Sequence, residues 1–147
     1  MTHEWHHDGF TVSTDPARLD LDVIHGFLTR SYWAAGISRE TVVRSIAHAI
    51  PFGVHDGAAQ VGFARVISDQ ATFAYLADVF VLESHRGRGL SKWLVECVHA
   101  HPGLQGLRRW VLLTRDAHGL YARSGWTPLA KPDRYMERWD PEVYRRG

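Results

Sequence analysis

The chain has 147 residues, which is enough for one domain with a substantial hydrophobic core and too few for two. Its 45% hydrophobic and 22% charged residues are ordinary for a globular protein, and a formal net charge of +1 argues against a nucleic-acid partner. No apolar run approaches the ~20 residues of a membrane helix, and the N-terminus lacks a signal-peptide pattern, so we expect a cytoplasmic protein without a membrane partner. The single cysteine excludes an internal disulfide and fits a reducing compartment.

The N-terminal segment contains HEWHH, residues 3–7, which matches the zinc-protease pattern H-E-x-x-H. That pattern binds a metal only on a helix, where the two histidines lie one turn apart. Here it runs into Asp8-Gly9 and the alternating residues 10–13, which favours a strand start or a loose end. A zinc-dependent hydrolase acting through His3 and His7 stays open as a remote alternative.

Two helices are predicted next, joined by an aromatic loop. The first opens at Asp20 or Asp22 and ends near Ser31, and the second follows Ser38 and stops before Pro51. Strand patterns then cover residues 52–55 and 60–67.

The dipeptide Asp56-Gly57 between these two strand patterns predicts a hairpin. After a turn at residues 68–70, a central strand of β-branched and aromatic residues extends to about residue 81.

The central strand runs into residues 86–91, RGRGLS, a glycine-punctuated turn that opens a helix. The first turn of a helix has unpaired N–H groups and the positive end of the helix dipole, and glycines let an anion approach the backbone. Arg86, Arg88 and Lys92 add positive charge. The strand, turn and helix therefore predict a phosphate site, although two glycines that merely relieve strain in a turn would give the same pattern.

The helix after the turn has an apolar face that includes Leu90, Leu94 and Cys97, so we expect Cys97 in the core rather than as a nucleophile. The pattern beyond it predicts a strand, a short helix and two closing strands, over residues 109–113, 116–124, 126–129 and 135–139.

Two motifs in this order carry a family resemblance. RGRGLS resembles the R/Q-x-x-G-x-G/A motif of the GCN5-related N-acetyltransferase (GNAT) family, and residues 120–126, LYARSGW, resemble its L-Y-x-x-x-G-F motif. Three positions depart from the family pattern: Ser91 replaces Gly or Ala, Trp126 replaces Phe, and Thr114 stands where many members have an Asn that contacts the cofactor. The resemblance implies an α/β domain over residues 1–147, with a mixed, mostly antiparallel sheet of about six or seven strands and about four flanking helices.

The resemblance also implies acetyl-CoA as the co-substrate, no metal, and acetyl transfer to a primary amine by direct attack in a ternary complex. The central strand would bind the pantetheine and polarise the thioester where it splays from its neighbour, and the glycine turn would hold the pyrophosphate. The cofactor-binding positions implied are Val79, Phe80, Val81, Arg86, Gly87, Arg88, Gly89, Leu90, Ser91, Lys92 and Thr114. We expect a side chain at Gly89 to find no room.

Tyr121 is implied as the general acid for the departing thiolate, because a phenol with an ordinary pKa of about 10 holds its proton about as tightly as a thiol. A core aromatic remains the alternative. Asp78 would receive the acceptor's proton, bind the charged amine, or form a structural ion pair, and Glu83 and Asp116 are weaker candidates for the base.

Tyr32 and Trp33 would line the acceptor pocket or pack between the helices. The partner is expected to be a small-molecule or peptide amine, and a homodimer stays open. A non-catalytic acyl-CoA-binding module is the main alternative to an enzyme; it would bind CoA and release no thiol with any amine.

Overall fold

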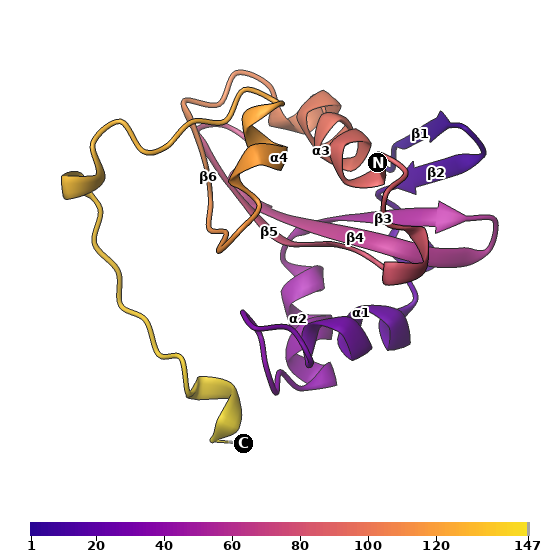
Figure 1. The fold of residues 1–147 in the computed structure, drawn as a ribbon, viewed down its shortest axis with the longest axis horizontal. Coiled ribbons are helices and arrows are strands. Elements are labelled where there is room, and N and C mark those ends of the chain that lie inside the picture. The colour runs from indigo at the N-terminus through magenta and orange to yellow at the C-terminus, as the bar shows by residue number, and fades with distance from the viewer. Residues whose placement is uncertain (147) are drawn as a thin grey trace.

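Six strands form one mixed sheet in the computed structural model of the protein, which describes residues 1–146 (Figure 1). The spatial order of the strands follows the chain from β1 to β6, and every neighbouring pair is antiparallel except β5 with β6. The strands are β1 (Glu4–His7), β2 (Phe10–Ser13), β3 (Ile50–Asp56), β4 (Ala59–Ser68), β5 (Phe73–Val81) and β6 (Arg109–Leu112). The predicted mixed, mostly antiparallel sheet is therefore confirmed. Of the predicted domain 1–147, residue 147 lies outside the described residues.

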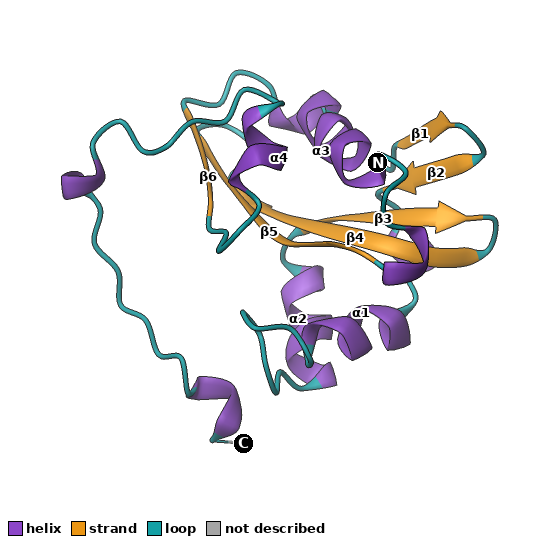
Figure 2. Ribbon diagram, viewed as in Figure 1, coloured by secondary structure: helices purple, strands orange, loops and turns teal. Residues whose placement is uncertain are grey.

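Helices cover both faces of the sheet, with α1 and α2 on one face and α3 and α4 on the other (Figure 2). Their bounds are α1 (Leu21–Leu28), α2 (Arg39–Ala47), α3 (Leu90–Ala100) and α4 (His118–Ala122), and short 3-10 turns lie between the larger elements. None of these helices, in the part of the chain that the structure describes, has the length and apolar character that crossing a membrane demands.

The starts of α1 and α2 follow the capping residues in the sequence. The Asp20 carboxylate accepts hydrogen bonds from the N–H groups of Asp22 and Val23, and the Ser38 hydroxyl accepts one from Thr41. By contrast α3 begins after Gly89 with no side-chain cap. Its first N–H groups are therefore left for another partner.

Each face of the sheet has its own hydrophobic core. The α3 and α4 face buries β-branched residues of β2 to β5 against the apolar stripe of α3, with Leu94 and Val98 fully buried. The other face packs α1 and α2 against Phe63 and Phe80. Cys97 lies in the first core, where burial raises the pKa of its thiol to about 12, which confirms the core interpretation.

The N-terminal histidines lie on a hairpin rather than a helix. β1 and β2 pair from Glu4↔Ser13 to His7↔Phe10 around a turn in which Asp8 and Gly9 have positive φ angles of 50° and 83°. Along a strand, four residues span about 13 Å. His3 and His7 therefore do not share the single helical face on which the zinc-hydrolase alternative depends.

A β-bulge interrupts β5 where it passes the middle of β4. The register changes between the pairs Phe63↔Phe80 and Arg65↔Ala77, so β5 has one more residue than β4 in this interval. The extra residue falls at Asp78, whose φ of 56° lies in the left-handed region. The bulge reverses which face of the sheet the following residues of β5 point to.

Residues 126–146 form no strand, so the two predicted closing strands, 126–129 and 135–139, were wrong. Pro128 has no N–H for a ladder, and the N–H of Trp126 is bonded to the carbonyl of Tyr121 at the end of α4. The 3-10 turn Pro132–Arg134 then leads the chain away from the sheet, so residues 135–139 have no strand to pair with (Figure 1).

Candidate active site

The central feature of the site is the parting of the two parallel strands β5 and β6. Their pairing runs from Phe73↔Arg109 to Leu76↔Leu112 and ends there, while β5 continues to Val81. The β5 edge over residues 77–81 therefore has no strand neighbour on the β6 side among residues 1–146. The splay that the family resemblance implied is present, and Val79, Phe80 and Val81 lie along it.

The glycine turn lies between the end of β5 and the start of α3. Gly87 and Gly89 have φ angles of 79° and 75°, which L side chains rarely adopt. The first intrahelical bond runs from the N–H of Trp93 to the carbonyl of Gly89, 3.1 Å apart. The N–H groups of Leu90, Ser91 and Lys92 precede it and have no backbone partner within residues 1–146.

The reason for glycine in this turn differs from the sequence-based expectation. A Cβ at Gly87 or Gly89 would meet no protein atom within 4 Å, so there is room for a side chain. What these positions require is the positive φ angle, which turns the helix N–H groups outward.

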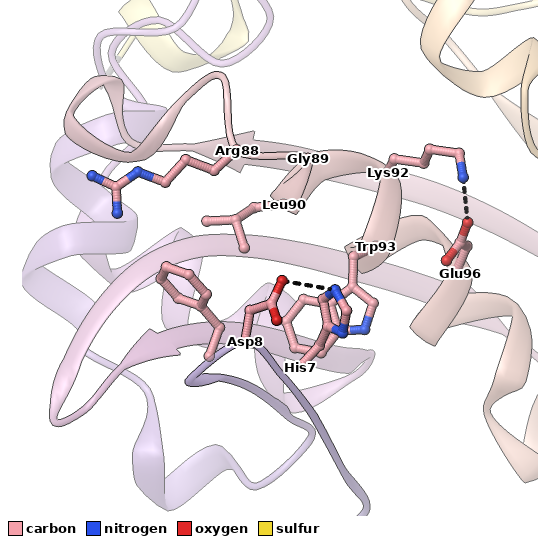
Figure 3. Close-up of a pocket in the computed structure, with 9 residues that line it drawn as sticks. His7, Asp8, Arg88, Gly89, Leu90, Lys92, Trp93 and Glu96 are labelled. Atoms are coloured by element: carbon pink, nitrogen blue, oxygen red, sulfur yellow. Dashed lines mark hydrogen bonds and ion pairs between the residues drawn. The ribbon is translucent and has the colours of Figure 1, made fainter.

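The three predicted cations around the turn play different parts. Arg86 donates from Nε to the carbonyl of Val81 at 3.0 Å and so ties the turn to the end of β5. Lys92 extends along α3 to Glu96, 2.8 Å away, rather than toward the turn (Figure 3). Arg88 forms no ion pair within the described residues, which leaves its guanidinium available.

A hollow of about 420 Å³ lies between the β1–β2 turn and the start of α3 (Figure 3). Its lining includes side chains of both charges and three aromatic rings: His7, Asp8, Phe10, Arg88, Gly89, Leu90, Lys92, Trp93 and Glu96. It adjoins the free N–H groups of α3.

Asp78 is held by two donors that come from different elements. Its Oδ2 accepts from the guanidinium Nε of Arg65 at 2.8 Å, and its Oδ1 accepts from the indole Nε1 of Trp33 at 2.9 Å. The Arg65 and Asp78 side chains are only 15% and 10% exposed. The ion pair is one of the three roles predicted for Asp78, and its roles toward the acceptor stay predictions.

The aromatic loop between α1 and α2 reaches across the opening. The Tyr32 hydroxyl accepts from the backbone N–H of Arg115 at 3.1 Å, and the guanidinium of Arg115 lies 4.0 Å from the Tyr32 ring centre. Trp33 packs against Tyr32 with ring centres 5.1 Å apart. Tyr32 and Trp33 pack against each other and are still 50% and 40% exposed, and their role in lining an acceptor pocket stays a prediction.

Tyr121 lies on α4, 8% exposed, with its ring centre 6.1 Å from that of Trp126. Burial, with a smaller contribution from Tyr32, raises the pKa of its phenol to about 12. Its hydroxyl forms no hydrogen bond within residues 1–146, so it is free to donate to a ligand.

The remaining predicted positions lie around this centre. The Thr114 hydroxyl accepts from the N–H of Ala117 at 3.0 Å and so stabilises the start of α4. Glu83 is exposed in the 3-10 turn Glu83–His85, and Asp116 is exposed and 3.8 Å from its neighbour Arg115. Neither carboxylate contacts Asp78 or Tyr121.

Sequence reasoning missed Arg65 and Arg115. Arg65 is one of many arginines in the sequence, and its contact with Asp78 depends on the register of β4 against a bulged β5. Arg115 meets Tyr32, 83 residues earlier in the chain. The available signal was the position of Arg65 in a strand that has no other charged residue, because a half-buried charge needs a partner.

Comparison with known proteins identifies the class. Residues 47–128 match the family model described as an acetyltransferase (GNAT) domain, and this region contains both motifs. A provisionally named acetyltransferase of Gibberella zeae is 31% identical over 141 residues, covering 82% of this chain and 80% of that protein. The chain belongs to the GNAT acetyltransferase family.

Solved structures agree with this assignment. A GNAT-family protein from Xanthomonas campestris pv. campestris is 54% identical with a TM-score of 0.91, covering 95% of this chain and 99% of that one. A GNAT-family acetyltransferase from Elizabethkingia anophelis, whose structure has acetyl-CoA bound, shares the fold with a TM-score of 0.65 at 14% identity, covering 91% and 90% of the two chains.

Proposed function

We propose that this protein is an N-acetyltransferase that moves an acetyl group from acetyl-CoA to a primary amine by direct attack in a ternary complex. One observation carries the proposal. The opening between β5 and β6 has the glycine turn and the free N–H groups of α3 at one end, and Asp78, Trp33 and Tyr32 beside it. An anionic donor and an amine acceptor can therefore reach the same strand from different directions.

The backbone of the glycine turn and of β5 suits acetyl-CoA as the acetyl donor, and the Elizabethkingia acetyltransferase with the same fold has acetyl-CoA bound. The N–H groups at the start of α3 are suited to the pyrophosphate, because the helix dipole and the unpaired donors act together. The unpaired edge of β5 over residues 77–81 offers the pattern of donors and acceptors that an amide-containing pantetheine arm needs. The thioester supplies the activated acyl group.

Acetyl transfer forms a C–N bond, breaks a C–S bond and moves one proton from the amine to the sulfur. Because the thioester oxygen becomes negative on the way, a backbone N–H at the opening stabilises the transition state.

The Tyr121 hydroxyl would face the departing sulfur as a donor. Burial raises the pKa of its phenol to about 12, above the ordinary pKa of a thiol, so full transfer of the phenol proton to a thiolate is uphill. We therefore infer that Tyr121 stabilises the developing thiolate mainly as a hydrogen-bond donor.

We further infer that Asp78 orients the acceptor side of the opening. Both of its oxygens already accept a hydrogen bond, and one of the donors is Trp33, on the loop that would line the acceptor pocket. A charged amine that approaches this carboxylate would gain a further charge-assisted bond.

The proposal is tested by measuring thiol release from acetyl-CoA against a panel of small amines, amino acids and peptides, beside calorimetric titration of acetyl-CoA. We expect micromolar to millimolar acetyl-CoA binding and amine-dependent thiol release with at least one class of acceptor. Binding without thiol release across the panel would instead indicate a non-catalytic acyl-CoA-binding module.

A further inference from the structure

The loop that follows β6 meets the loop between α1 and α2 across the opening (Figure 1). The backbone N–H of Arg115, in the first loop, donates to the hydroxyl of Tyr32, in the second, at 3.1 Å. This contact lies on the side of the sheet that α1 and α2 cover, whereas the glycine turn leads into α3 on the opposite face. Arg115 is therefore set apart from the N–H groups proposed for the pyrophosphate.

The guanidinium of Arg115 is held in place without being neutralised. It lies 4.0 Å from the ring centre of Tyr32. Within residues 1–146 its ion-pair contact is with the neighbouring Asp116 at 3.8 Å, and the two side chains are 65% and 70% exposed. Such a distance is too long for a hydrogen bond, and an exposed pair contributes little. Stacking orients the guanidinium plane and leaves the N–H donors along its edge for a planar anion.

Arg65, the other arginine beside the opening, has its partner. It donates to Asp78 at 2.8 Å, and their side chains are 15% and 10% exposed, so the two charges cancel within the site. A ligand with a second ammonium group finds no surplus of negative charge here. A ligand with a carboxylate finds one cation with unused donors, which is Arg115.

Two aromatic rings connect the carboxylate of Asp78 to the guanidinium of Arg115. The Trp33 indole donates to Asp78, the Trp33 and Tyr32 ring centres are 5.1 Å apart, and Tyr32 carries Arg115 on its ring. The acceptor side of the opening thus has an acidic group, a partly exposed aromatic surface and a basic group in succession. An ammonium group, an apolar body and a carboxylate on one molecule match these three features.

We propose that the acceptor is an amine that also carries a carboxylate, and that Arg115 binds this carboxylate while the amine enters the opening beside Asp78. The proposal rests on the proposed function, because it names the acceptor class of the same site. Acetyl transfer leaves the carboxylate unchanged, so Arg115 binds the acceptor equally before and during the reaction. Its contribution should therefore appear in KM for the acceptor rather than in kcat.

The first test uses matched acceptors that differ in the carboxylate. One pair is para-(aminomethyl)benzoate and para-methylbenzylamine, and a second pair, phenylalanine and phenethylamine, has the carboxylate next to the amine. We expect the wild type to prefer the carboxylate in at least one pair by at least tenfold in kcat/KM, measured by thiol release. Arg115→Gln should reduce that preference to within about twofold. Turnover of the partner without a carboxylate should stay within a few-fold of wild type, which shows that the variant keeps an intact opening.

Charge reversal gives the sharper comparison. Arg115→Glu should favour para-xylylenediamine, whose second ammonium replaces the carboxylate, over para-(aminomethyl)benzoate. Arg108→Glu is the matched control, because Arg108 is exposed, precedes the other end of β6 and changes the net charge by the same amount. The control should keep the preference of the wild type.

A binding measurement tests Arg115 without catalysis. Saturation-transfer NMR titrates para-(aminomethyl)benzoate and phenylalanine into the wild type, Arg115→Glu and Arg108→Glu, and only Arg115→Glu should weaken binding, by at least fivefold. The proposal is overturned by equal kcat/KM within both pairs in the wild type, by a preference or an affinity for the carboxylate that survives Arg115→Glu, or by no binding to the wild type. Loss of acetyl-CoA affinity in Arg115→Gln would assign the guanidinium to the cofactor and also overturn it. Absence of thiol release with every amine would defeat the proposed function, and the NMR comparison would still decide the role of Arg115.

Discussion

Asp78 has a strained backbone conformation and a side chain that accepts two hydrogen bonds. A left-handed conformation costs a non-glycine residue roughly 1–2 kcal/mol, and Asp78 adopts it with φ at 56°. The two hydrogen bonds from Arg65 and Trp33 offset that penalty. Because the bulge takes the β5 backbone out of its ladder beside the opening, strain is held where free backbone groups are useful.

The first prediction concerns Asp78→Asn. Asparagine replaces one of the two accepting oxygens with an NH₂ donor and removes the negative charge, so Arg65 loses the partner that neutralises it where the two side chains are only 10–15% exposed. Breaking a buried pair costs roughly 3–5 kcal/mol, and each 1 kcal/mol lowers Tm by about 2–4 °C in a chain of this size. We also expect kcat/KM for the amine to fall at least tenfold with acetyl-CoA affinity unchanged, measured by thiol release and calorimetry.

The double variant Arg65→Gln/Asp78→Asn separates the two effects, because it removes both charges and retains hydrogen bonding. If Asp78 acts on the acceptor, thermal stability recovers in part and kcat/KM stays low. Recovery of both together would mean that the carboxylate serves only the ion pair.

The second prediction concerns Tyr121→Phe. The hydroxyl forms no hydrogen bond within the described residues, so Tm should change little. If the phenol donates to the developing thiolate, kcat should fall by about 10²-fold, while acetyl-CoA binding stays within a few-fold. Wild-type-like turnover in steady-state thiol release would make Tyr121 a core aromatic.

The raised pKa of Tyr121 adds a pH dependence to this prediction. Burial places the pKa of the phenol at about 12, above its ordinary value of 10.0, so the hydroxyl keeps its proton through the neutral and mildly alkaline range. Turnover of the wild type should therefore show no alkaline loss caused by this group between pH 7 and about 10. A loss that disappears in Tyr121→Phe would contradict the raised pKa.

At the scale of elements, the glycine turn before α3 matters because the positive φ angle of Gly89 sets where the free N–H groups of α3 point. The third prediction is that Gly89→Val weakens acetyl-CoA binding at least tenfold, or about 1.4 kcal/mol. Valine disfavours the φ of 75°, so the turn and the free N–H groups of α3 shift. Calorimetry on the folded variant measures the effect.

Gly106→Val is the matched control for Gly89→Val. Gly106 has a φ of 71°, its Cβ would also meet no atom within 4 Å, and it precedes β6 at the end remote from the splay. The two variants should lose similar thermal stability, and only Gly89→Val should lose affinity. Equal acetyl-CoA affinities in the two variants would show that the glycine turn is not part of the cofactor site.

The elements with local signals were predictable. Asp20 and Ser38 begin helices because their side chains satisfy nearby N–H groups, and Asp56-Gly57 turns a hairpin because Gly57 adopts a φ of 61°. The glycine turn and its helix follow the same logic, since every determinant lies within a few residues.

The features that depend on distant partners were not predictable. The alternation in residues 135–139 indicates an extended chain but says nothing about a neighbouring strand, and a strand exists only when it pairs. The Arg65–Asp78 pair depends on a bulge that shifts register by one residue, and no residue type marks that shift. Both the Arg65–Asp78 ion pair and the absence of a strand at residues 135–139 therefore depend on distant parts of the chain.

At the scale of the whole molecule, three histidines couple stability to pH: His55 and His101 are buried, and His99 is half-buried. Burial lowers the pKa of His55, His99 and His101 from 6.5, with Arg18 adding to the effect at His55. At two of them the geometry requires a neutral ring. The indole of Trp126 donates to Nε2 of His99 at 2.9 Å, and a backbone N–H donates to Nδ1 of His101 at 2.9 Å.

The fourth prediction follows from the direction of these shifts. A lowered pKa means that the unfolded chain binds these protons more readily than the folded one, so the free energy of unfolding falls as pH drops below about 6.5 and gains nothing from these groups above it. Tm should therefore decrease between pH 7.5 and 5. His99→Gln keeps an acceptor for Trp126 but cannot titrate, so its Tm should fall less over the same interval. His48→Gln changes an exposed histidine and should follow the wild type. Thermal denaturation of the three proteins across this range decides the matter, and an acid slope in His99→Gln equal to that of the wild type would show that the ring of His99 takes no part.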